Sequence, residues 1–386
     1  MGKGVVLLLV LFSLTASCLT VPLPVNAGSK TIVVPDDYPT ISSAIGNATA
    51  GDTILVKKGT YEGPINQTLV IDKTLSLIGE DANKTKINLH PLYTVKWILT
   101  QSFSGAADAI TILANDVILS NFTIVTNGGS ISATANGTKI LGNKILGSGA
   151  ITGISIDGYY NNITGNIIEN YNSIRVEGSF NVIARNSAKN LSLNVTDSSV
   201  ISNNTCWGIT LRSCNLNIIS GNKIGGSYSA CGIMVAHNSS HNLFYANYVS
   251  EFAASVAFNS AENNTFYHNN FVNNDVRQVS VYIGPARNFW DYKKEGNFWD
   301  DYNGTDGNRD GIGDTPYVID ANNQDNYPLM YPYAIEDDAV VLPPPEPFPT
   351  ALVVAVVATV AVVAVGLLVY FKKRNRQAEN HLVKKP

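Results

Sequence analysis

The sequence predicts an all-β fold, a solenoid of the parallel β-helix type, with an N-terminal cap helix and one C-terminal transmembrane helix. A six-residue phrase ending in Asn recurs eight times, about every 21 residues. Most copies are followed by a second short run that alternates apolar and polar residues, such as Ile154-Ser155-Ile156. β-branched residues dominate the apolar positions, and helical spacing is absent. This pattern predicts short strands that stack as coils about 4.8 Å apart.

Each phrase consists of a polar or small residue, two mostly apolar residues, two variable residues and Asn. The eight copies are DVILSN (116–121), TKILGN (138–143), NNITGN (161–166), NVIARN (181–186), SVISNN (199–204), NIISGN (217–222), NLFYAN (242–247) and NTFYHN (264–269). Asn tolerates left-handed backbone geometry, so the final Asn is expected to form a turn. Stacked coils then align the Asn amides in a hydrogen-bonded ladder, which is a structural role.

The first 27 residues fit a secretory signal peptide. Lys3 precedes the apolar run 5–12, and Val25-Asn26-Ala27 fits the small-residue pattern of a cleavage site. The mature chain is therefore expected to begin at Gly28.

Two segments are expected to cover the ends of the solenoid, because an open β-helix end is an exposed sheet edge. Residues 38–52, YPTISSAIGNATAGD, predict a short amphipathic helix with Thr40 as its N-cap at the N-terminal end. At the other end, residues 288–304 are rich in aromatic side chains and are expected to lie over the last coil.

The C-terminal part predicts a membrane anchor. Residues 351–371 contain no charge and are long enough to span a bilayer core of about 30 Å as a helix. The basic tail 372–386 is expected in the cytoplasm, and the Pro-rich residues 343–350 predict a stiff stalk. Residues 28–342 are therefore expected to form the extracellular domain of a single-pass protein of the cell membrane.

The charge balance argues against nucleic acid as a partner. The chain carries a net charge of −4; the tail after residue 371 contributes +5 and Lys3 contributes +1, so residues 28–371 carry −10. An acidic domain repels polyanions.

Two further features fit an exported domain. Twelve Asn-x-Ser/Thr sequons lie between Asn47 and Asn303, as expected of a glycoprotein. Outside the cell, the spacing of Cys206 and Cys214 allows a disulfide, and Cys231 leaves the pairing open.

Two stretches carry a family resemblance, TISSAIGNATAGDTILVKKGTYEGPINQTLVIDKTLSLIGE (40–80) and GNFWDDYNGTDGNRDGIGDTPYVIDANNQDNYPLMYPY (296–333). Together with the repeats between them, they resemble the NosD-type right-handed β-helix family over about residues 31–333. The resemblance implies a right-handed coil within the wider class of carbohydrate-binding and sugar-hydrolase β-helix domains. The name-giving members are described as periplasmic copper-binding proteins that help mature a copper enzyme. The same scaffold carries lyases, hydrolases, esterases, adhesins and accessory proteins, so the resemblance implies a fold more strongly than an activity.

The segment DGNRDGIGDTP (306–316) predicts a calcium loop within residues 306–317. The pattern supplies oxygen ligands at alternating positions and a sharp turn at Gly311. With Asp306 as position 1 of the twelve-residue calcium-loop pattern, position 12 is Tyr317 in place of a bidentate Glu, and Asp320 is a candidate substitute. A structural Ca²⁺ is expected to fix this segment against the last coil. The predicted ligands are Asp306, Asn308, Asp310, the Ile312 carbonyl and Asp314.

Copper requires soft or imidazole ligands. His237 and His241 are close in sequence, and His268 follows about one coil later. No spacing among the His, Met and Cys residues resembles a strong copper motif, so the sequence favours exposed turn histidines over copper binding.

The strand alignment suggests one patch for carbohydrate chemistry. Asp157 and Glu177 follow the buried ends of two successive alternating runs, and Arg175 points outward beside Glu177. Two adjacent carboxylates can share a proton or hold a sugar, whereas the alternative is an exposed ion-pair cluster on a solvated sheet. Aromatic residues in or near turns offer rings for sugar faces or for turn packing: Tyr159, Tyr160, Tyr171, Phe180, Tyr245, Tyr248 and Tyr267.

The sequence thus predicts a cell-surface protein that acts in recognition or structure, with glycan binding as its candidate activity. A polysaccharide lyase or hydrolase that uses Asp157, Glu177 and Arg175 is the first alternative. A NosD-like copper accessory protein is the second. The lyase and hydrolase patterns are not matched residue by residue, which favours a binding role over an enzyme.

Overall fold

The computed structural model describes residues 28–91, 93–98, 101–147, 152–170, 173–226, 231–274, 277–284 and 286–335. These residues lie in the first of two compact units, Met1–Asp337. The predicted signal peptide 1–27, the stalk 343–350, the transmembrane helix 351–371 and the tail lie outside the described residues. No helix within the described ranges is both long and apolar enough to cross a membrane.

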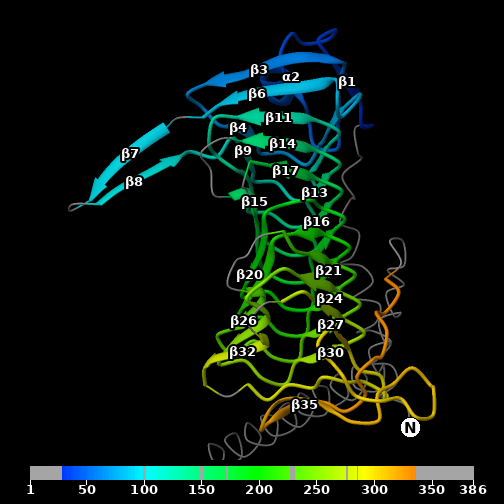
Figure 1. The fold of residues 1–386 in the computed structure, drawn as a ribbon. Helices are drawn as coiled ribbons and strands as arrows, with labels where there is room; N and C mark the ends of the chain where they lie inside the picture. Colours follow the sequence, from blue (N-terminus) through cyan, green and yellow to red (C-terminus); the bar gives the residue numbers. More distant parts are fainter. Residues whose placement is uncertain are drawn as a thin grey trace, which may run out of the picture. The chain divides into compact units, whose positions relative to one another are not determined.

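The predicted parallel β-helix is confirmed, and the chain winds through stacked coils (Figure 1). Each typical coil contributes a strand to each of three sheets, called sheets A, B and C. Neighbouring strands within these sheets are parallel; in sheet A, for example, Ile118, Lys139 and Asn162 are partners in successive coils. The repeat therefore sets the register from one coil to the next.

Sheet A runs the length of the stack. In the described chain its eleven strands are β1 (Thr31–Val34), β2 (Thr53–Val56), β5 (Ser76–Gly79), β10 (Ile118–Ser120), β13 (Lys139–Leu141), β16 (Asn162–Thr164), β19 (Val182–Ala184), β21 (Val200–Ser202), β24 (Ile218–Ser220), β27 (Leu243–Tyr245) and β30 (Thr265–Tyr267).

Sheet B is divided into two parts that are joined through single bridges at Ser187. The first part is β3 (Gly59–Ile65), β6 (Thr85–His90), β11 (Thr123–Thr126), β14 (Lys144–Gly147) and β17 (Ile167–Glu169). The second part is β22 (Thr205–Cys206), β25 (Lys223–Ile224), β28 (Tyr248–Ser250), β31 (Asn270–Val272) and β33 (Phe298–Trp299).

Sheet C provides the third face. Its described strands are β4 (Leu69–Ile71), β9 (Ile110–Ile112), β12 (Ile131–Ala133), β15 (Thr152–Asp157), β18 (Ser173–Glu177), β20 (Asn190–Asn194), β23 (Gly208–Arg212), β26 (Cys231–Ala236), β29 (Ala254–Asn259) and β32 (Arg277–Ile283). Two antiparallel hairpins do not belong to these three sheets: β7 (Tyr93–Ile98) with β8 (Gln101–Ala106), and β34 (Tyr317–Asp320) with β35 (Asn323–Asp325).

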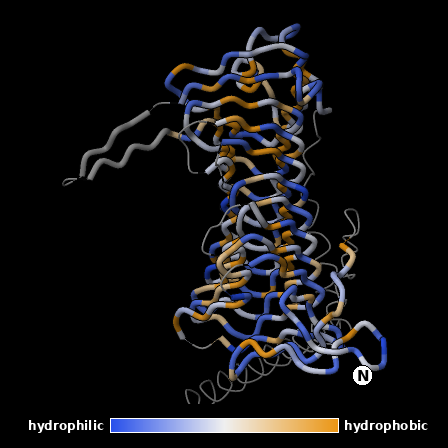
Figure 2. Tube along the Cα trace, viewed as in Figure 1, coloured by the Kyte–Doolittle hydropathy of each residue, from blue (hydrophilic) through white to orange (hydrophobic). Residues whose placement is uncertain are grey.

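The interior of the coils is a continuous apolar core. Apolar and polar residues alternate along the strands (Figure 2), as period-two patterning requires. The middle residue of successive sheet A strands is fully buried, from Ile140 through Ile163 and Ile183 to Ile201 and Ile219. Burying each such side chain stabilises the fold by about 1.5–3 kcal/mol. Every coil obtains this burial from its neighbours in the stack.

The predicted Asn ladder is confirmed and runs between sheets A and B. Each Oδ1 accepts hydrogen bonds from the backbone N–H and from Nδ2 of the Asn one coil earlier, at 2.8–3.1 Å. We call this the Asn143 ladder; its members are Asn143, Asn166, Asn186, Asn204, Asn222, Asn247, Asn269 and Asn297.

A second ladder, which the sequence analysis did not predict, lies between sheets C and A. It uses the first residue of each phrase, and one member is Ser199 in place of Asn. Both ladders satisfy backbone N–H groups that would otherwise be buried without partners. The members of this Asn161 ladder are Asn161, Asn181, Ser199, Asn217, Asn242, Asn264 and Asn288.

The expectation that the final Asn of each phrase adopts the left-handed conformation is wrong. The residue before it does so: Arg185 has φ 55° and His268 has φ 57°. This turn directs the following Asn side chain inward, where it is buried. The first phrase is also displaced by one residue, because Asn121 takes the left-handed position (φ 63°) and Phe122 takes the ladder position.

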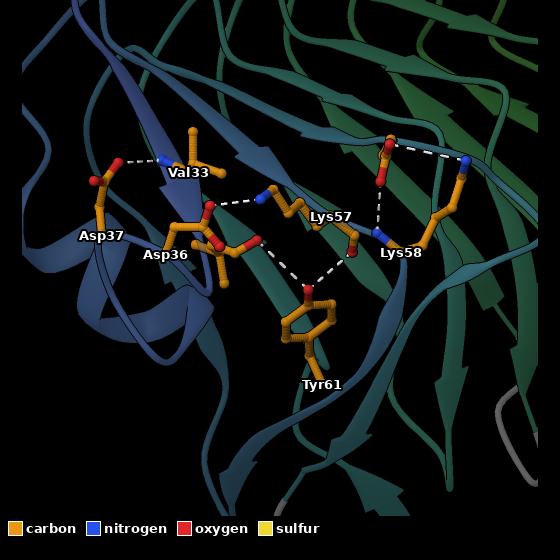
Figure 3. A network of polar contacts seen from close by, with 8 residues as sticks. Val33, Asp36, Asp37, Lys57, Lys58 and Tyr61 are labelled. Carbon is orange, nitrogen blue, oxygen red and sulfur yellow. Dashed lines mark hydrogen bonds and ion pairs between the residues drawn. The ribbon is translucent and has the colours of Figure 1, made fainter.

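The predicted N-terminal cap helix is confirmed as α2 (Ile41–Asn47). Thr40 Oγ1 accepts a hydrogen bond of 3.1 Å from the Ser43 N–H, and Ile41 and Ala44 are buried. A polar network ties the first strands together beside the helix (Figure 3): Lys57 Nζ lies 2.5 Å from Asp36 Oδ2, and the Tyr61 hydroxyl donates to the Lys57 carbonyl at 2.9 Å.

The aromatic segment 288–304 covers the last coil, as predicted. Trp290 and Trp299 are buried. Their rings stack on Phe266 and Phe271, respectively, with centroids 4.6 Å apart in both pairs. These flat rings replace the apolar side chains that a further coil would supply.

The disulfide that the cysteine spacing allows does not form. Cys206, Cys214 and Cys231 are free thiols. Cys206 is buried on the inner side of sheet B, and Cys214 is buried in the turn after sheet C. Burial raises the pKa of the Cys206 thiol to about 12 and that of Cys214 to about 11, so both are poor nucleophiles.

Candidate carbohydrate-binding face on sheet C

Sheet C brings the predicted carboxylates into one row. Asp157 on β15 is the direct partner of Glu177 on β18, and Arg175 forms an ion pair with Glu177. The next two coils place Asn194 and Arg212 in the same row. The predicted patch is therefore a polar row on an outer sheet face, with exposed Asp157 and Arg212 at its ends.

The row offers hydrogen-bonding groups of both kinds to a ligand. Asp157 and Glu177 lie one coil apart, about 4.8 Å between backbones. Two carboxylates at this separation can hold sugar hydroxyls or share a proton. The Glu177 carboxylate is engaged by Arg175, and the row continues with an amide and a guanidinium rather than a third carboxylate.

Two aromatic rings stack directly beyond this row. Tyr160 follows Asp157 by three residues, and Phe180 follows Glu177 by three residues. Their centroids are 5.1 Å apart, and their planes differ by 9°. Tyr160 is 67% exposed and Phe180 is 47% exposed, so the pair presents apolar surface to solvent.

Both rings are carried on left-handed backbone. Tyr160 has φ 59° and Phe180 has φ 60°, a conformation that is rare for bulky residues. The turn imposes it in every coil, since the equivalent residues Ser198, Leu216 and His241 also have positive φ. The left-handed conformation costs about 1–2 kcal/mol for a residue other than Gly, Asn or Asp. The sequence thus places exposed aromatic side chains where Gly or Asn would be more stable.

The remaining predicted aromatic residues lie elsewhere. Tyr245 and Tyr267 stack at 5.6 Å on sheet A, and Tyr292 contacts Tyr267 at 5.3 Å. Burial raises the pKa of Tyr267 to about 12. Tyr248 lies on sheet B, and Tyr171 lies outside the described residues.

The predicted calcium loop closes on itself through its own carboxylates. Asp306 accepts hydrogen bonds from the N–H groups of Asp310 and Gly311 at 3.2 and 2.9 Å. Asp310 accepts one from Ile312 at 2.9 Å, and Asp314 accepts one from the N–H of residue 307 at 2.7 Å. Gly311 has φ 88°, as the sharp turn at this position requires.

The loop therefore has the oxygen donors and the turn of a calcium loop, with the Asn308 amide bonded to Asp310. Among the described residues, no three or more His, Cys, Asp or Glu side chains form a group that could hold a metal ion, and the loop carboxylates are no exception.

The histidines are turn residues, as expected. His237, His241 and His268 all have positive φ. His268 Nε2 lies 2.8 Å from Glu295, and its ring stacks on Tyr333 at 4.0 Å. Burial lowers the pKa of His268, although Glu295 opposes the shift. The contacts of His268 with Glu295 and Tyr333 tie the C-terminal segment to this coil.

Comparisons with known proteins agree with this fold. Residues 192–304 match the family described as "Periplasmic copper-binding protein (NosD)", a narrower segment than the resemblance noted in the sequence. A search of curated proteins gives no match.

Three solved structures illustrate the structural similarity. The mannuronan C-5 epimerase AlgE4 A-module of Azotobacter vinelandii is 14% identical, with a TM-score of 0.42, over 67% of this chain and 80% of that one. The PL6 family alginate lyase AlyGC is 13% identical, with a TM-score of 0.44, over 80% of this chain and 58% of that one. A tailspike mutant of E. coli bacteriophage HK620 is 14% identical, with a TM-score of 0.36, over 67% of this chain and 60% of that one. The chain is a right-handed parallel β-helix, and its residues 192–304 are similar to the NosD family.

Proposed function

We propose that the protein binds glycan chains at the cell surface, and that the sheet C face around Tyr160 and Phe180 is the binding site. The observation that carries this proposal is the exposed stack of nearly parallel Tyr160 and Phe180 rings on left-handed backbone. Aromatic faces pack against the C–H faces of sugar rings, and Asp157, Glu177 and Arg175 provide hydrogen bonds to hydroxyl groups. An exported domain on a membrane anchor would present this face outward.

Replacing Tyr160 and Phe180 together by Asn tests the proposal. Asn removes both rings and suits the left-handed backbone, so we expect retention on immobilised polysaccharides to fall by at least about tenfold while the melting temperature is unchanged or higher. The measurement is affinity retention of the purified full-length protein on a panel of neutral and acidic polysaccharides, combined with thermal unfolding.

Leu216→Asn is the matched control. Leu216 occupies the equivalent turn position, has φ 59° and is 62% exposed, but it has no ring. Retention by this variant should equal that of the wild type. Unchanged retention by the double Asn variant would disprove the site. New chain ends in the panel would instead favour the polysaccharide lyase or hydrolase that the pairing of Asp157 with Glu177 suggests.

We also propose a structural Ca²⁺ in the loop 306–317, with Asp306, Asn308, Asp310, the Ile312 carbonyl and Asp314 as ligands. The support is the ligand spacing and the turn at Gly311. A ligand that binds only the folded state, at a free concentration of a hundred times its Kd, raises the free energy of unfolding by about 2.7 kcal/mol. Calcium should therefore raise the melting temperature of the wild type but not that of Asp306→Asn/Asp310→Asn. Asp72→Asn, a change of an exposed carboxylate on a distant coil, should respond as the wild type does. An equal calcium response in the double variant would rule the loop out.

A further inference from the structure

The outer face of sheet B is hollowed where the sheet is divided. β17 and β22 are joined there through single bridges at Ser187. A cavity of about 380 Å³ lies over this break, lined in part by Lys189, Thr205 and Trp207. Gly225 also lines the cavity, and it is a point of close approach to the next coil, since a Cβ there would lie 2.9 Å from Ser250 Oγ. The hollow lies where the strands of sheet B are short, with two residues each in β22 and β25.

A second hollow of about 520 Å³ continues over the following coils. The strand register places Thr205, Lys223 and Tyr248 in one outward row on β22, β25 and β28. Lys223 and Tyr248 line the second hollow, and Gly225, also on the β25 coil, lines the first. The two hollows are therefore neighbours along one groove on this face.

The groove combines cations with aromatic faces. Lys189 Nζ lies 5.4 Å from the centroid of the Trp207 ring, a cation–π contact that holds the ammonium group over the first hollow. Lys223 is exposed, and Tyr248 is half-buried beside it. In a chain of net charge −4, these two lysines supply two positive charges along the groove.

These features select a sugar that carries carboxylate groups at moderate density. Aromatic ring faces pack against the C–H face of a pyranose, and the lysine ammonium groups donate hydrogen bonds to its carboxylates. Lys189 and Lys223 lie two coils apart, about 10 Å, which suits carboxylates on alternate sugar units because one unit is about as long as one coil spacing. Glu251 borders the second hollow and disfavours a densely sulfated polymer.

We propose that this groove on sheet B binds an oligosaccharide of uronic acid units. The inference is independent of the sheet C site, because it uses a different face and different residues. Trp207 and Tyr248 stack on sugar rings, while Lys189 and Lys223 pair with carboxylates.

The test is calorimetric titration of the purified full-length protein with a hexamer of galacturonate and with the same hexamer as its methyl ester. We expect the acid to bind and the ester to show no binding. Lys223→Gln should weaken binding of the acid roughly tenfold, as expected for one charge-assisted contact, and should reduce its salt dependence. Trp207→Ala should abolish binding. Lys223 is exposed, so we expect Lys223→Gln to fold normally. It therefore tests the groove even if Trp207→Ala does not fold.

Lys144→Gln is the matched control. Lys144 lies on the same face of sheet B, is bonded to Glu169 at 3.1 Å and lines neither hollow. Its loss changes the net charge by the same amount and should leave affinity unchanged. Equal weakening by Lys144→Gln, equal binding of the ester, or no binding of the acid would overturn the proposal. Binding retained in the Tyr160→Asn/Phe180→Asn variant would separate this groove from the sheet C site.

Discussion

Replacing Asn204 by Ala is expected to lower the free energy of unfolding by about 3–5 kcal/mol, because it interrupts the Asn143 ladder at its middle. Asn204 Oδ1 accepts bonds from the N–H and Nδ2 of Asn186 at 2.9 and 3.0 Å. Asn204 Nδ2 donates to the Ile183 carbonyl at 2.8 Å. The substitution leaves buried groups of Asn186 and Ile183 without these partners. Urea unfolding followed by circular dichroism measures the loss.

Asn203→Gly is the control, because it changes an Asn in the same turn without touching the ladder. Asn203 has φ 54°, and Gly221 occupies the equivalent position one coil later. Gly adopts this conformation freely, so the stability of this variant should stay within about 1 kcal/mol of the wild type. If Asn204→Ala and Asn203→Gly had equal effects, the ladder would not be the source of the stability.

The coils could be predicted from the sequence because the alternating residues that define each strand are close together in the chain and the same pattern recurs in every coil. Inward residues such as Ile163 and Ile183 recur at a nearly constant interval, and strand alternation assigns them to one face. The left-handed positions could not be predicted in this way. They hold residues as different as Gly165, Arg185 and Ala246, so composition carries no signal. Stacking of complete coils imposes the conformation.

The candidate sites differ in the same way: one could be predicted from the repeated pattern, and the other could not. Asp157 and Glu177 could be paired from sequence, because each follows an alternating run by a fixed distance. The contact between Lys189 and Trp207 could not, since β22 has only two residues and shows no alternation. Its geometry depends on where sheet B is divided and on the close approach of the coils at Gly225. Neither property is encoded in a short motif.

The C-terminal end of the Asn143 ladder closes on a carboxylate, and this predicts a dependence of stability on pH. Asp325 Oδ2 accepts bonds from the Asn297 N–H at 2.7 Å and from Trp299 Nε1 at 2.9 Å, and Oδ1 accepts one from the Tyr327 N–H at 3.0 Å. Burial outweighs these donors and raises the pKa of Asp325 to about 6, from an ordinary value of 3.8.

The sign of the effect follows from this shift. Between about pH 4 and pH 6 the folded protein holds a proton on Asp325 that the unfolded chain has released, so stability falls as pH rises through this window. The rise in the pKa of Asp325 from 3.8 to about 6 can lower the free energy of unfolding by at most about 3 kcal/mol across this window. Above about pH 6 Asp325 is ionised in both the folded and the unfolded protein, so its contribution to the free energy of unfolding no longer changes with pH.

Asp325→Asn should remove this dependence, because an amide does not titrate. The variant loses the bond from Tyr327, which costs about 1 kcal/mol. Urea unfolding at about pH 4 and about pH 7 gives the free energy of unfolding of the wild type and of the variant. The other carboxylates contribute equally to both proteins, so their contribution cancels in the difference between the two free energies. We expect the stability of the wild type, relative to the variant, to fall between the two pH values. A relative rise would mean that the aligned N–H dipoles of the ladder stabilise the Asp325 anion more than burial destabilises it.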